Sequence, residues 1–442
     1  MSSKSKNDTL VQKNSPEYYR IKPLEELTKN LDWELPCSKS HFIRWLLLAA
    51  QSDKKSIFKT PSAIGNDIFS CVRVLEKLGI KIEKFNDYWV VEGRNLKNLK
   101  KSSLVLDCGN SATTLRFIAM LIARNGIEAE IRGDESLSQR NFSELIEILD
   151  DGGVSVKRES SINSLPFRLK GTFNSEKIKV STKKTSQLIS ALLVTMPSSI
   201  GKTEFILSNN IVSKPYFELT MRLCEKTGAN INFKNNKILV SSWKPKILDE
   251  IIIPGEASLV VFPLLFSKLH DCTILIKNWP KLEASLGFEK LFTSLKFFGL
   301  NYREDDEGIL IFNIGGGSEL SLNISDNIDL ITPLSILMGI SNGGIITGIN
   351  NAINKESNRI NSTFELCSAF GIKLKSEEKL KIFKSKLQSP SNVISAKRDH
   401  RVQMSAFILL SYTGGKAASN YWYQTSDPLF LLRLKGFGVS IN

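Results

Sequence analysis

The chain has 442 residues, of which 42% are hydrophobic, and its formal net charge is +14. A chain of this length is usually too long to fold around a single hydrophobic core, so we expect two domains of roughly 200 residues each. The positive charge is compatible with nucleic acid, a membrane surface or small acidic substrates as partners. A lysine-rich solvated surface with no binding role is the alternative.

Six cysteines without a C-x-x-C pair and three scattered histidines favour neither a disulfide framework nor a metal cluster. No segment is long and apolar enough to cross a bilayer, and the polar stretch Met1–Asn14 lacks the apolar core of a signal peptide. We therefore expect a cytoplasmic protein with a frayed N-terminal tail.

The first predicted helix starts in Pro36–Ser40 and continues through the apolar stretch Trp45–Ala50. Proline cannot continue a strand ladder and serine is a good N-cap, so a strand should end and a helix begin here. Ser40 and Arg44 share a helix face, and Lys39 lies beside free N–H groups that favour an anion. The segment predicts a phosphate or carboxylate site, with an ordinary capped helix carrying surface cations as the alternative.

An internal repeat organises the whole chain. Six apolar stretches of helical length follow polar starts, at intervals of 71 to 75 residues. They are apolar almost all round, so we expect six buried helices. The six stretches are Lys39–Gln51, Ser111–Asn125, Ser186–Pro197, Ala257–Leu269, Asp329–Asn342 and His400–Tyr412.

A second series keeps nearly the same period. In each repeat an amphipathic helix ends at a glycine, and a short alternating strand follows. Glycine is the expected residue where a helix stops in the left-handed conformation. Each unit is therefore predicted as strand, apolar helix, strand, amphipathic helix and strand. The six glycines are Gly79, Gly153, Gly228, Gly299, Gly371 and Gly438.

Three such units should form each of the two domains. Pro36-Cys37 precedes the first unit and Pro254-Gly255 separates the third from the fourth, so we place two crossovers there. The predicted lobes are 38–254 and, holding both chain termini, 1–37 with 255–442. Equivalent units bring equivalent ends together, so the polar helix starts should meet in the cleft between the lobes.

The polar helix starts are rich in cations and hydroxyls, with a few carboxylates among them. This composition suits a site that binds a doubly anionic ligand and moves protons. Ordinary structural roles are the alternative, with Asp329 and His400 as capping residues and 355–359 as a solvated helix face.

Several motifs stand at these helix starts: Pro-Cys-Ser-Lys-Ser-x3-Arg, Gly-Asn-x2-Thr-x2-Arg, Ser-Gln after a basic stretch, Val-Ser-Lys-Pro-Tyr, Lys-Glu-x2-Arg and Asp-His-Arg. In this order they resemble the EPSP synthase (3-phosphoshikimate 1-carboxyvinyltransferase) group of the enolpyruvyl transferase family. The resemblance runs from about Leu35 to the C-terminus. It implies an α/β (α+β) fold with two lobes, each made of three βαβαββ units arranged like an inverted α/β barrel.

The resemblance also implies which residues form the site. Lys39, Asp329 and Glu356 would be catalytic, with His400 beside them. The contacts of shikimate 3-phosphate would be Lys39, Ser40, Arg44, Thr185, Ser186, Gln187, Ser213, Asp329, Asn351 and Lys355. Those of phosphoenolpyruvate would be Lys39, Asn110, Ala112, Arg140, Gln187, Arg359 and Arg401.

The implied reaction is an addition followed by an elimination, in a monomer that takes two small anions and uses no metal or organic cofactor. The 5-hydroxyl of shikimate 3-phosphate would lose a proton to Asp329 and attack C2 of phosphoenolpyruvate, while Glu356 or Lys39 protonates the methylene carbon. The adduct then loses phosphate, as a step of aromatic amino-acid (chorismate) biosynthesis. Neither nucleic acid nor a membrane is an implied partner.

Four positions depart from the family pattern. Cys37 replaces a usual glycine, and Ala112 stands where many members have glycine. Asn141 replaces a usual proline, and Thr425 stands in place of a lysine that binds phosphoenolpyruvate in some members. The methyl group of Ala112 would crowd the phosphoenolpyruvate pocket, so we expect tolerance of glyphosate, a bulkier analogue.

Other functions fit the pattern less well. The sister enzyme acting on UDP-N-acetylglucosamine carries a reactive cysteine in a loop where this chain has Glu135 and no cysteine. A carboxyvinyl transferase with a different acceptor is compatible with the departures. A basic nucleic-acid-binding repeat protein would show steep salt dependence. The arginines here, however, lie at helix starts and not along a stripe interleaved with aromatic residues.

Overall fold

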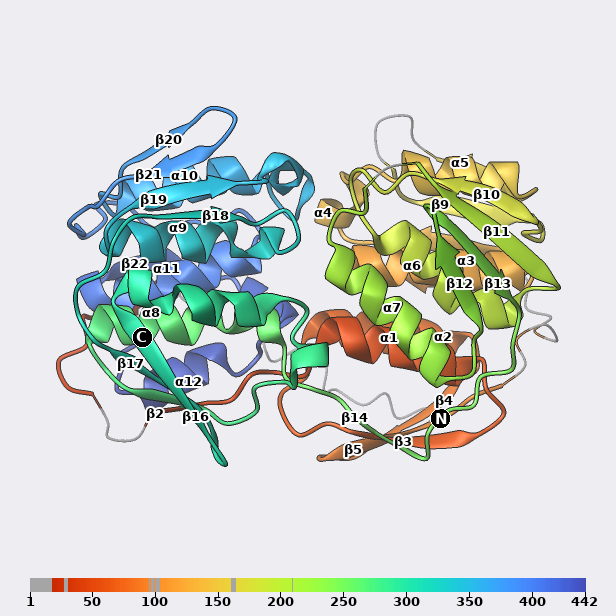
Figure 1. Ribbon diagram of the computed structural model, residues 1–442, viewed down its shortest axis with the longest axis horizontal. Helices are drawn as coiled ribbons and strands as arrows, with labels where there is room; N and C mark the ends of the chain where they lie inside the picture. The colour runs from red at the N-terminus through yellow and green to blue at the C-terminus, as the bar shows by residue number, and fades with distance from the viewer. Residues whose placement is uncertain are drawn as a thin grey trace, which may run out of the picture.

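The computed structural model describes residues 18–27, 31–94, 96, 99, 104–159, 164–208 and 210–442, with Asp305 and Asn354 described by their backbone alone. The expected frayed tail, Met1–Asn14, lies outside these residues. The described elements form two bodies side by side, one built from the red-to-green part of the chain and the other from the green-to-blue part (Figure 1). The fold is a mixed α/β architecture of several small sheets.

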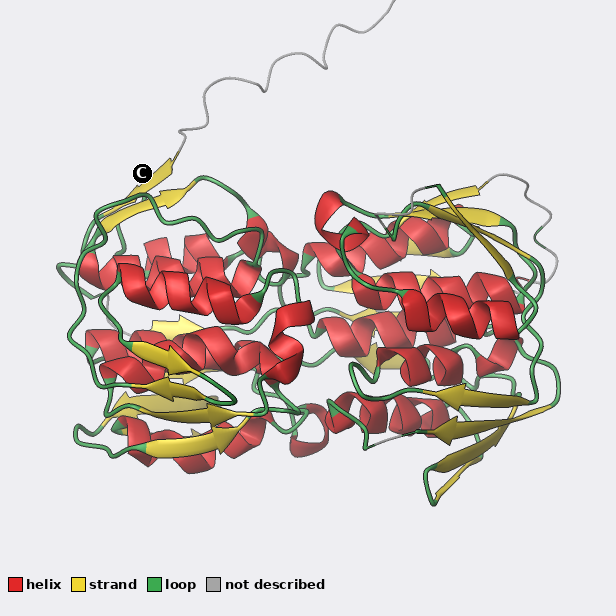
Figure 2. Cartoon of the chain, turned by 90° about the horizontal axis from the view of Figure 1, so that it is seen from above, coloured by secondary structure: helices red, strands yellow, loops and turns green. Residues whose placement is uncertain are grey.

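The six predicted buried helices are present, and their starts lie close to the expected residues. Helices α1, α3 and α6 pack together in one body, and α8, α9 and α11 pack together in the other. They lie inward, with the sheets outside them (Figure 2). Their bounds are Lys39–Ala50 for α1, Ala112–Arg124 for α3, Gln187–Val194 for α6, Val261–His270 for α8, Ile331–Ile340 for α9 and His400–Thr413 for α11.

Two of these helices start differently from the prediction. The segments predicted as the first turns of α8 and α9 are separate 3₁₀ turns, η3 (Ala257–Leu259) and η6 (Ile328–Leu330). A proline stands three residues into each α-helix, at Pro263 and Pro333. Proline has no N–H to donate to the carbonyl four residues earlier, so regular α-helix cannot extend back through that turn.

The second helical series is also present, and it ends as predicted. All six predicted glycines have positive φ values, from 69° to 102°. The fourth member differs, because Phe288–Phe298 forms a 3₁₀ helix, η5, and not an α-helix. The other five are α2 (Asn66–Lys77), α5 (Ser143–Asp151), α7 (Lys214–Lys226), α10 (Arg359–Ala369) and α12 (Phe430–Gly436).

Three four-stranded sheets are each built within one unit and share one pattern. In each sheet the first two strands in the sequence are parallel neighbours. The fourth strand in the sequence lies beside the second, and the third forms the far edge, with both of these pairings antiparallel. The sheets are β6-β7-β9-β8 (Leu104–Asp107, Ala129–Arg132, Phe167–Lys170, Ser155–Arg158), β10-β11-β13-β12 (Lys177–Val180, Lys202–Leu207, Lys237–Ser241, Ile231–Lys234) and β18-β19-β21-β20 (Leu320–Asn323, Gly344–Thr347, Leu380–Ile382, Leu374–Ser376).

In the two further sheets the parallel edge strands are exchanged between the bodies. Two linking segments, 34–38 after β2 and 253–256 after β14, make this exchange possible. Strand β2 precedes α1 in the sequence but pairs with β15, and β14 precedes η3 but pairs with β3. The linking segments run past each other, with a bridge between Cys37 and Gly255. The sheets are β14-β3-β5-β4 (Glu250–Ile252, Lys55–Lys59, Tyr88–Glu92, Lys81–Lys84) and β16-β17-β15-β2 (Leu300–Asp305, Gly308–Asn313, Ile274–Ile276, Leu31–Trp33).

The sixth unit has a reduced sheet. Strand β1 (Tyr18–Ile21) pairs antiparallel with β22 (Gly415–Ala418) in a two-stranded sheet. The predicted closing strand at 439–441 lies against β1 and not β22, with a bridge between Ile441 and Ile21 and backbone hydrogen bonds from Arg20 and Lys22 to Asn442 and Ser440. Among the described residues, no helix has both the length and the hydropathy that crossing a bilayer requires.

Burial of the apolar helices stabilises both bodies. Phe42 on α1 is fully buried, with its ring 5.8 Å from that of Phe58 and 5.0 Å from that of Trp89. Because the cavity left by truncation would remain largely unfilled, Phe42→Ala should lower the free energy of unfolding by about 3–5 kcal/mol. Urea unfolding monitored by circular dichroism measures this change.

Phe85→Ala is the matched control, because that ring is 48% exposed. Its free energy of unfolding should change by only about 0.5 kcal/mol. Equal losses for the two variants would contradict the assignment of α1 to the core.

Candidate active site

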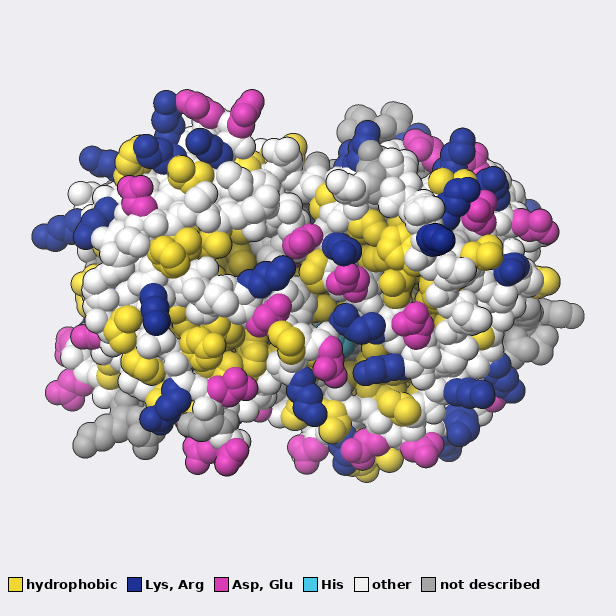
Figure 3. Space-filling model, in the orientation of Figure 1, with side chains coloured by type: hydrophobic (Ala, Val, Ile, Leu, Met, Phe, Trp, Pro, Cys, Tyr) yellow, Lys and Arg dark blue, Asp and Glu magenta, His cyan; other side chains and the backbone are white. Residues whose placement is uncertain are grey.

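A cavity of about 450 Å³ lies where the two bodies meet. Lys39, Ala112 and Gln187, the first residues of α1, α3 and α6, line it from one body. Asp329 of η6 and Arg401 of α11 line it from the other. Lysine and arginine side chains alternate with carboxylates along this junction (Figure 3). The helix starts of both bodies therefore face one polar space, as the repeat suggested.

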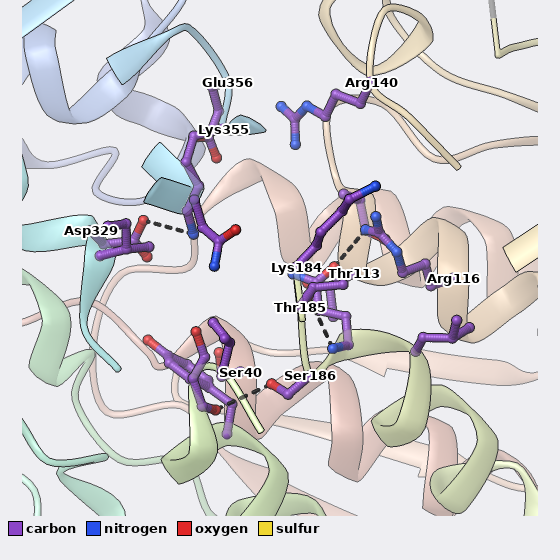
Figure 4. Close-up of a pocket in the computed structure, with 18 of the residues that line it drawn as sticks. Ser40, Thr113, Arg116, Arg140, Lys184, Thr185, Ser186, Asp329, Lys355 and Glu356 are labelled. Atoms are coloured by element: carbon purple, nitrogen blue, oxygen red, sulfur yellow. Dashed lines mark hydrogen bonds and ion pairs between the residues drawn. The ribbon is translucent and has the colours of Figure 1, made fainter. Parts of the chain in front are cut away.

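Most of the residues that the sequence singles out lie around this cavity. In the close-up, Asp329, Lys355 and Glu356 face Arg140, Thr185 and Ser186 across the open space (Figure 4). The lining residues among those expected are Lys39, Ser40, Arg44, Ala112, Arg140, Thr185, Ser186, Gln187, Ser213, Asp329, Asn351, Lys355, Glu356 and Arg401. Asn110, Arg359 and His400 do not line it and lie one layer behind.

Arg359 is fully buried and sits between three carboxylates. Its Nε donates to Asp399 at 2.8 Å, one terminal nitrogen donates to Asp329 at 2.6 Å, and the other donates to Glu356. Burial alone would lower the pKa of this guanidinium, but the carboxylates hold the pKa above its ordinary value. Arg359 is thus a permanent cation that fixes the two carboxylates expected to transfer protons.

Asp329 and Glu356 are ionised in this arrangement. Burial would raise the pKa of Asp329, but Lys355 at 3.3 Å, Arg401 at 3.7 Å and Arg359 hold it well below its ordinary value. Burial would likewise raise the pKa of Glu356, and Arg359 and Arg140 outweigh that effect. An anion that binds these cations reduces their influence and so makes both carboxylates better proton acceptors.

His400 is a neutral side chain behind the cavity wall. It is buried, and this burial lowers its pKa to about 4. The capping role lies with Asp399, whose carboxylate accepts from the backbone N–H groups of Arg401 and Val402. Asn110 likewise lies behind the wall and holds Arg140 in place: its side chain accepts from Arg140 and donates to Asp134 at 2.6 Å.

Lys39 is held by two carboxylates that the sequence did not assign to the site. Its ammonium pairs with Asp67 at 2.8 Å, and its backbone N–H donates to Glu256 at 3.1 Å. Burial alone would lower the pKa of Lys39, but Asp67 and Glu356 raise it, so the side chain stays protonated. The sequence indicates that Glu256 lies at a polar helix start. Its contact with Lys39, by contrast, joins distant parts of the chain and is known only from the fold.

Two arginines at the cavity add positive charge and, within the described part of the chain, form no ion pair with a carboxylate. Arg44 donates to neutral oxygens of Thr220, Ser40 and Tyr216, and burial lowers its pKa to about 10. Arg116 donates to the side-chain oxygen of Gln187 at 2.7 Å, and burial again lowers its pKa to about 10. Arg116 belongs to the Gly-Asn-x2-Thr-x2-Arg motif, which could have indicated its role.

The four departures from the family pattern lie in different places. Ala112 and Asn141 line the cavity. Cys37 is buried at the crossing of the linking segments, and its thiol donates to the carbonyl of Ser62 at 3.3 Å. Thr425 is not a lining residue, although its neighbour Ser426 is. In the described part of the chain, no group of three or more His, Cys, Asp and Glu residues is placed to hold a metal ion.

The fold and this site define an enolpyruvyl transferase architecture. The EPSP synthase of Acinetobacter baumannii superimposes with a TM-score of 0.77 at 17% identity, over 97% of this chain and 100% of that one. The enolpyruvyl transferase NikO of Streptomyces tendae gives a TM-score of 0.72 at 13% identity, over 96% of this chain and 98% of that one. These likenesses establish the fold.

Sequence comparison establishes the family. The family model for EPSP synthase (3-phosphoshikimate 1-carboxyvinyltransferase) matches residues 21–416, and the chain belongs to this family. A protein named 3-phosphoshikimate 1-carboxyvinyltransferase from Methanococcoides burtonii is 28% identical over 90% of this chain and 91% of its own. One of the same name from Sulfurisphaera tokodaii is 29% identical over 91% and 95%.

The fold should lose stability as the pH falls from 6.5 to 4. Burial lowers the pKa of His400 to about 4 and that of His41 to about 3, while both titrate near 6.5 in the unfolded chain. As the pH falls, the unfolded chain therefore takes up protons before the folded protein does. At pH 5 each histidine should lower the free energy of unfolding by up to about 2 kcal/mol.

Urea unfolding at pH 7 and pH 5 tests this expectation. The variant His400→Gln should lose less stability between the two pH values than the parent does, because one titrating group is gone. An unchanged pH dependence in this variant would contradict the buried neutral state of His400.

Proposed function

We propose that this chain transfers the carboxyvinyl group of phosphoenolpyruvate to the 5-hydroxyl of shikimate 3-phosphate and releases phosphate, in aromatic amino-acid (chorismate) biosynthesis. One observation carries the proposal beyond family membership. Among the described residues, the Nε atoms of Arg140 and Arg401 are buried and have no hydrogen-bond partner, and these arginines line the same cavity from opposite bodies. Buried donors are normally satisfied, so a bound anion between the bodies is the expected partner.

Phosphoenolpyruvate is the anion that these donors fit. Lys39, Arg140 and Arg401 supply positive charge for its phosphate and carboxylate. Gln187 adds an amide whose oxygen is already engaged by Arg116, which leaves the NH₂ group to donate. Arg359, also expected to contact phosphoenolpyruvate, stands behind this group and is held by Asp329, Glu356 and Asp399, so it adds positive potential to the pocket.

Shikimate 3-phosphate fits the hydroxyl-rich part of the cavity. Thr185, Ser186 and Ser213 line it together with Arg44, and Lys355 faces Thr185 and Ser186 from the other side of the space (Figure 4). Ser213 has a left-handed backbone, with φ 55° and ψ 45°, and its side chain does not cap α7. A strained non-glycine residue whose hydroxyl is left for a ligand is typical of a binding site.

The protonation states suggest how the steps are divided. Asp329 is an ionised base that accepts the proton of the 5-hydroxyl, and the oxygen then attacks C2 of phosphoenolpyruvate. Lys39 keeps its proton in the unliganded protein whereas Glu356 is ionised, which favours Lys39 as the donor to the methylene carbon. The phosphate then leaves with the proton held by Asp329, and a methyl proton returns to the neutral amine of Lys39, which restores the double bond and both side chains.

Closure of two lobes around both substrates is part of the proposal. The lobes are 38–254 and the remainder of the chain, and the enzyme works as a monomer in the cytoplasm. Contacts across the cleft are polar and partly exposed: Ser136 donates to the carbonyl of Glu356 at 3.3 Å, Asn351 donates to that of Lys183 at 3.4 Å, the N–H of Lys214 donates to Asp326 at 3.3 Å, and Arg398 pairs with Glu135 at 2.6 Å. An exposed ion pair contributes little, so the lobes can separate to admit substrates.

Phosphate release from purified protein with both substrates tests the activity. Removal of the base in Asp329→Asn should lower kcat by about 10²–10⁴-fold, because an amide cannot accept the hydroxyl proton. Asp150→Asn, an exposed change on α5, should behave as the parent. No release from the parent protein would sink the proposed function.

Ala112 provides a test of the phosphoenolpyruvate pocket. Because its methyl group takes space at the cavity wall, Ala112→Gly should lower the glyphosate concentration that halves the rate. Initial rates with glyphosate in competition with phosphoenolpyruvate measure the effect. Unchanged inhibition would place the inhibitor away from the start of α3.

A further inference from the structure

Glu256 lies at the point where the two linking segments cross. The N–H of Ser38 donates to the carbonyl of Pro254 at 2.8 Å, and the N–H of Glu256 donates to that of Pro36 at the same distance. The side chain of Glu256 is buried at this crossing and also lines the cavity. It is therefore placed between the two bodies and next to the reacting groups.

The carboxylate of Glu256 joins the starts of two helical segments, one in each body. One oxygen accepts from the N–H of Lys39 at 3.1 Å and from the hydroxyl of Ser38 at 3.2 Å, at the start of α1. The other oxygen accepts from the N–H of Ser258 at 3.4 Å, in η3 before α8. The negative charge thus rests on helix N–H groups, where the dipoles favour it.

This arrangement fills the anion site that the sequence predicted at the start of α1. The first N–H of the helix points to a carboxylate of the protein itself. The ammonium of Lys39 turns the other way, to Asp67. The end of α1 is therefore occupied, and what Lys39 can offer a substrate anion is its side chain, which is 30% exposed and also pairs with Asp67.

The same contacts continue to Arg401. Its two terminal nitrogens donate to Ser258, one to the carbonyl at 3.0 Å and one to the hydroxyl at 2.7 Å. A chain of hydrogen bonds therefore runs from Lys39 through Glu256 and Ser258 to Arg401. These are the two cations proposed above to hold phosphoenolpyruvate from opposite bodies.

We infer that Glu256 is a positioning residue, which sets Lys39 and Arg401 relative to each other across the crossing and so adapts the cleft to phosphoenolpyruvate. The inference rests on the proposed function. A carboxylate is suited to the task because both of its oxygens accept, whereas an amide would turn an NH₂ group towards one of the donors. Shikimate 3-phosphate depends less on this link, because most of its expected contacts lie elsewhere.

The test compares the KM values of the two substrates in Glu256→Gln. The KM of phosphoenolpyruvate should rise about tenfold, and clearly more than that of shikimate 3-phosphate, because a charge-assisted link is lost. The matched control is Glu130→Gln, which alters a similarly buried glutamate on β7, paired with Arg132 of the same strand and Arg168 of β9, away from the cavity. Both KM values should stay at the parent level in this control.

If Glu256→Gln does not fold, the variant Ser258→Ala tests the same positioning role. It removes only the hydroxyl to which Arg401 donates, and it should raise the KM of phosphoenolpyruvate by about threefold. An active parent with an unchanged KM for phosphoenolpyruvate in these variants, or with equal rises for both substrates, would overturn the positioning role alone. A parent that releases no phosphate would overturn the proposed function, and this inference with it.

Discussion

A guanidinium removed from water must be paired, and the pairing of Arg359 determines much of the site. Its three carboxylate partners come from different places in the chain: Asp329 in η6, Glu356 before α10 and Asp399 at the start of α11. Leaving one buried charge without its partner typically costs about 3–5 kcal/mol, so the geometry of all three is strongly enforced. The carboxylates that would transfer protons are thus placed by the same contacts that make the body stable.

The repeat explains how such a site can arise from ordinary helices. Each buried helix starts at the cleft, so its N-terminal N–H groups and positive dipole end point towards the same space. Part of this positive potential is balanced inside the protein. The carboxylate of Glu256 accepts a hydrogen bond from a backbone N–H at the start of α1, and that of Asp399 does the same at the start of α11. What is left for ligands is the charge on the side chains, above all Arg140 and Arg401 with their unpaired Nε atoms.

The sequence predicted those features that depend on local rules. The period, the buried helices and the six left-handed glycines follow from hydrophobic pattern and helix-ending chemistry, which are properties of short segments. The turns before Pro263 and Pro333 could have been suspected from proline alone, whereas nothing in the local pattern of 288–298 distinguishes the 3₁₀ form of η5 from an α-helix. By contrast, the contact between Lys39 and Glu256 joins residues 217 positions apart, and nothing local to either residue indicates it. The burial of Arg359 was missed for the same reason, since a lysine- and arginine-bearing helix start looks solvated until its partners are known.

The exchange of β2 and β14 has a consequence for how the chain is made. During synthesis β2 emerges early, but its partner β15 follows only after the whole of the first body has been made. The sheet around β3 likewise lacks its edge until β14 appears at the end of that body. An open edge attracts other strands, so the growing chain carries exposed pairing sites for much of its translation. The first body is the contiguous segment 38–254, whereas the second combines 1–37 with 255–442, so cutting the chain at the crossing separates β2 from the body to which it belongs.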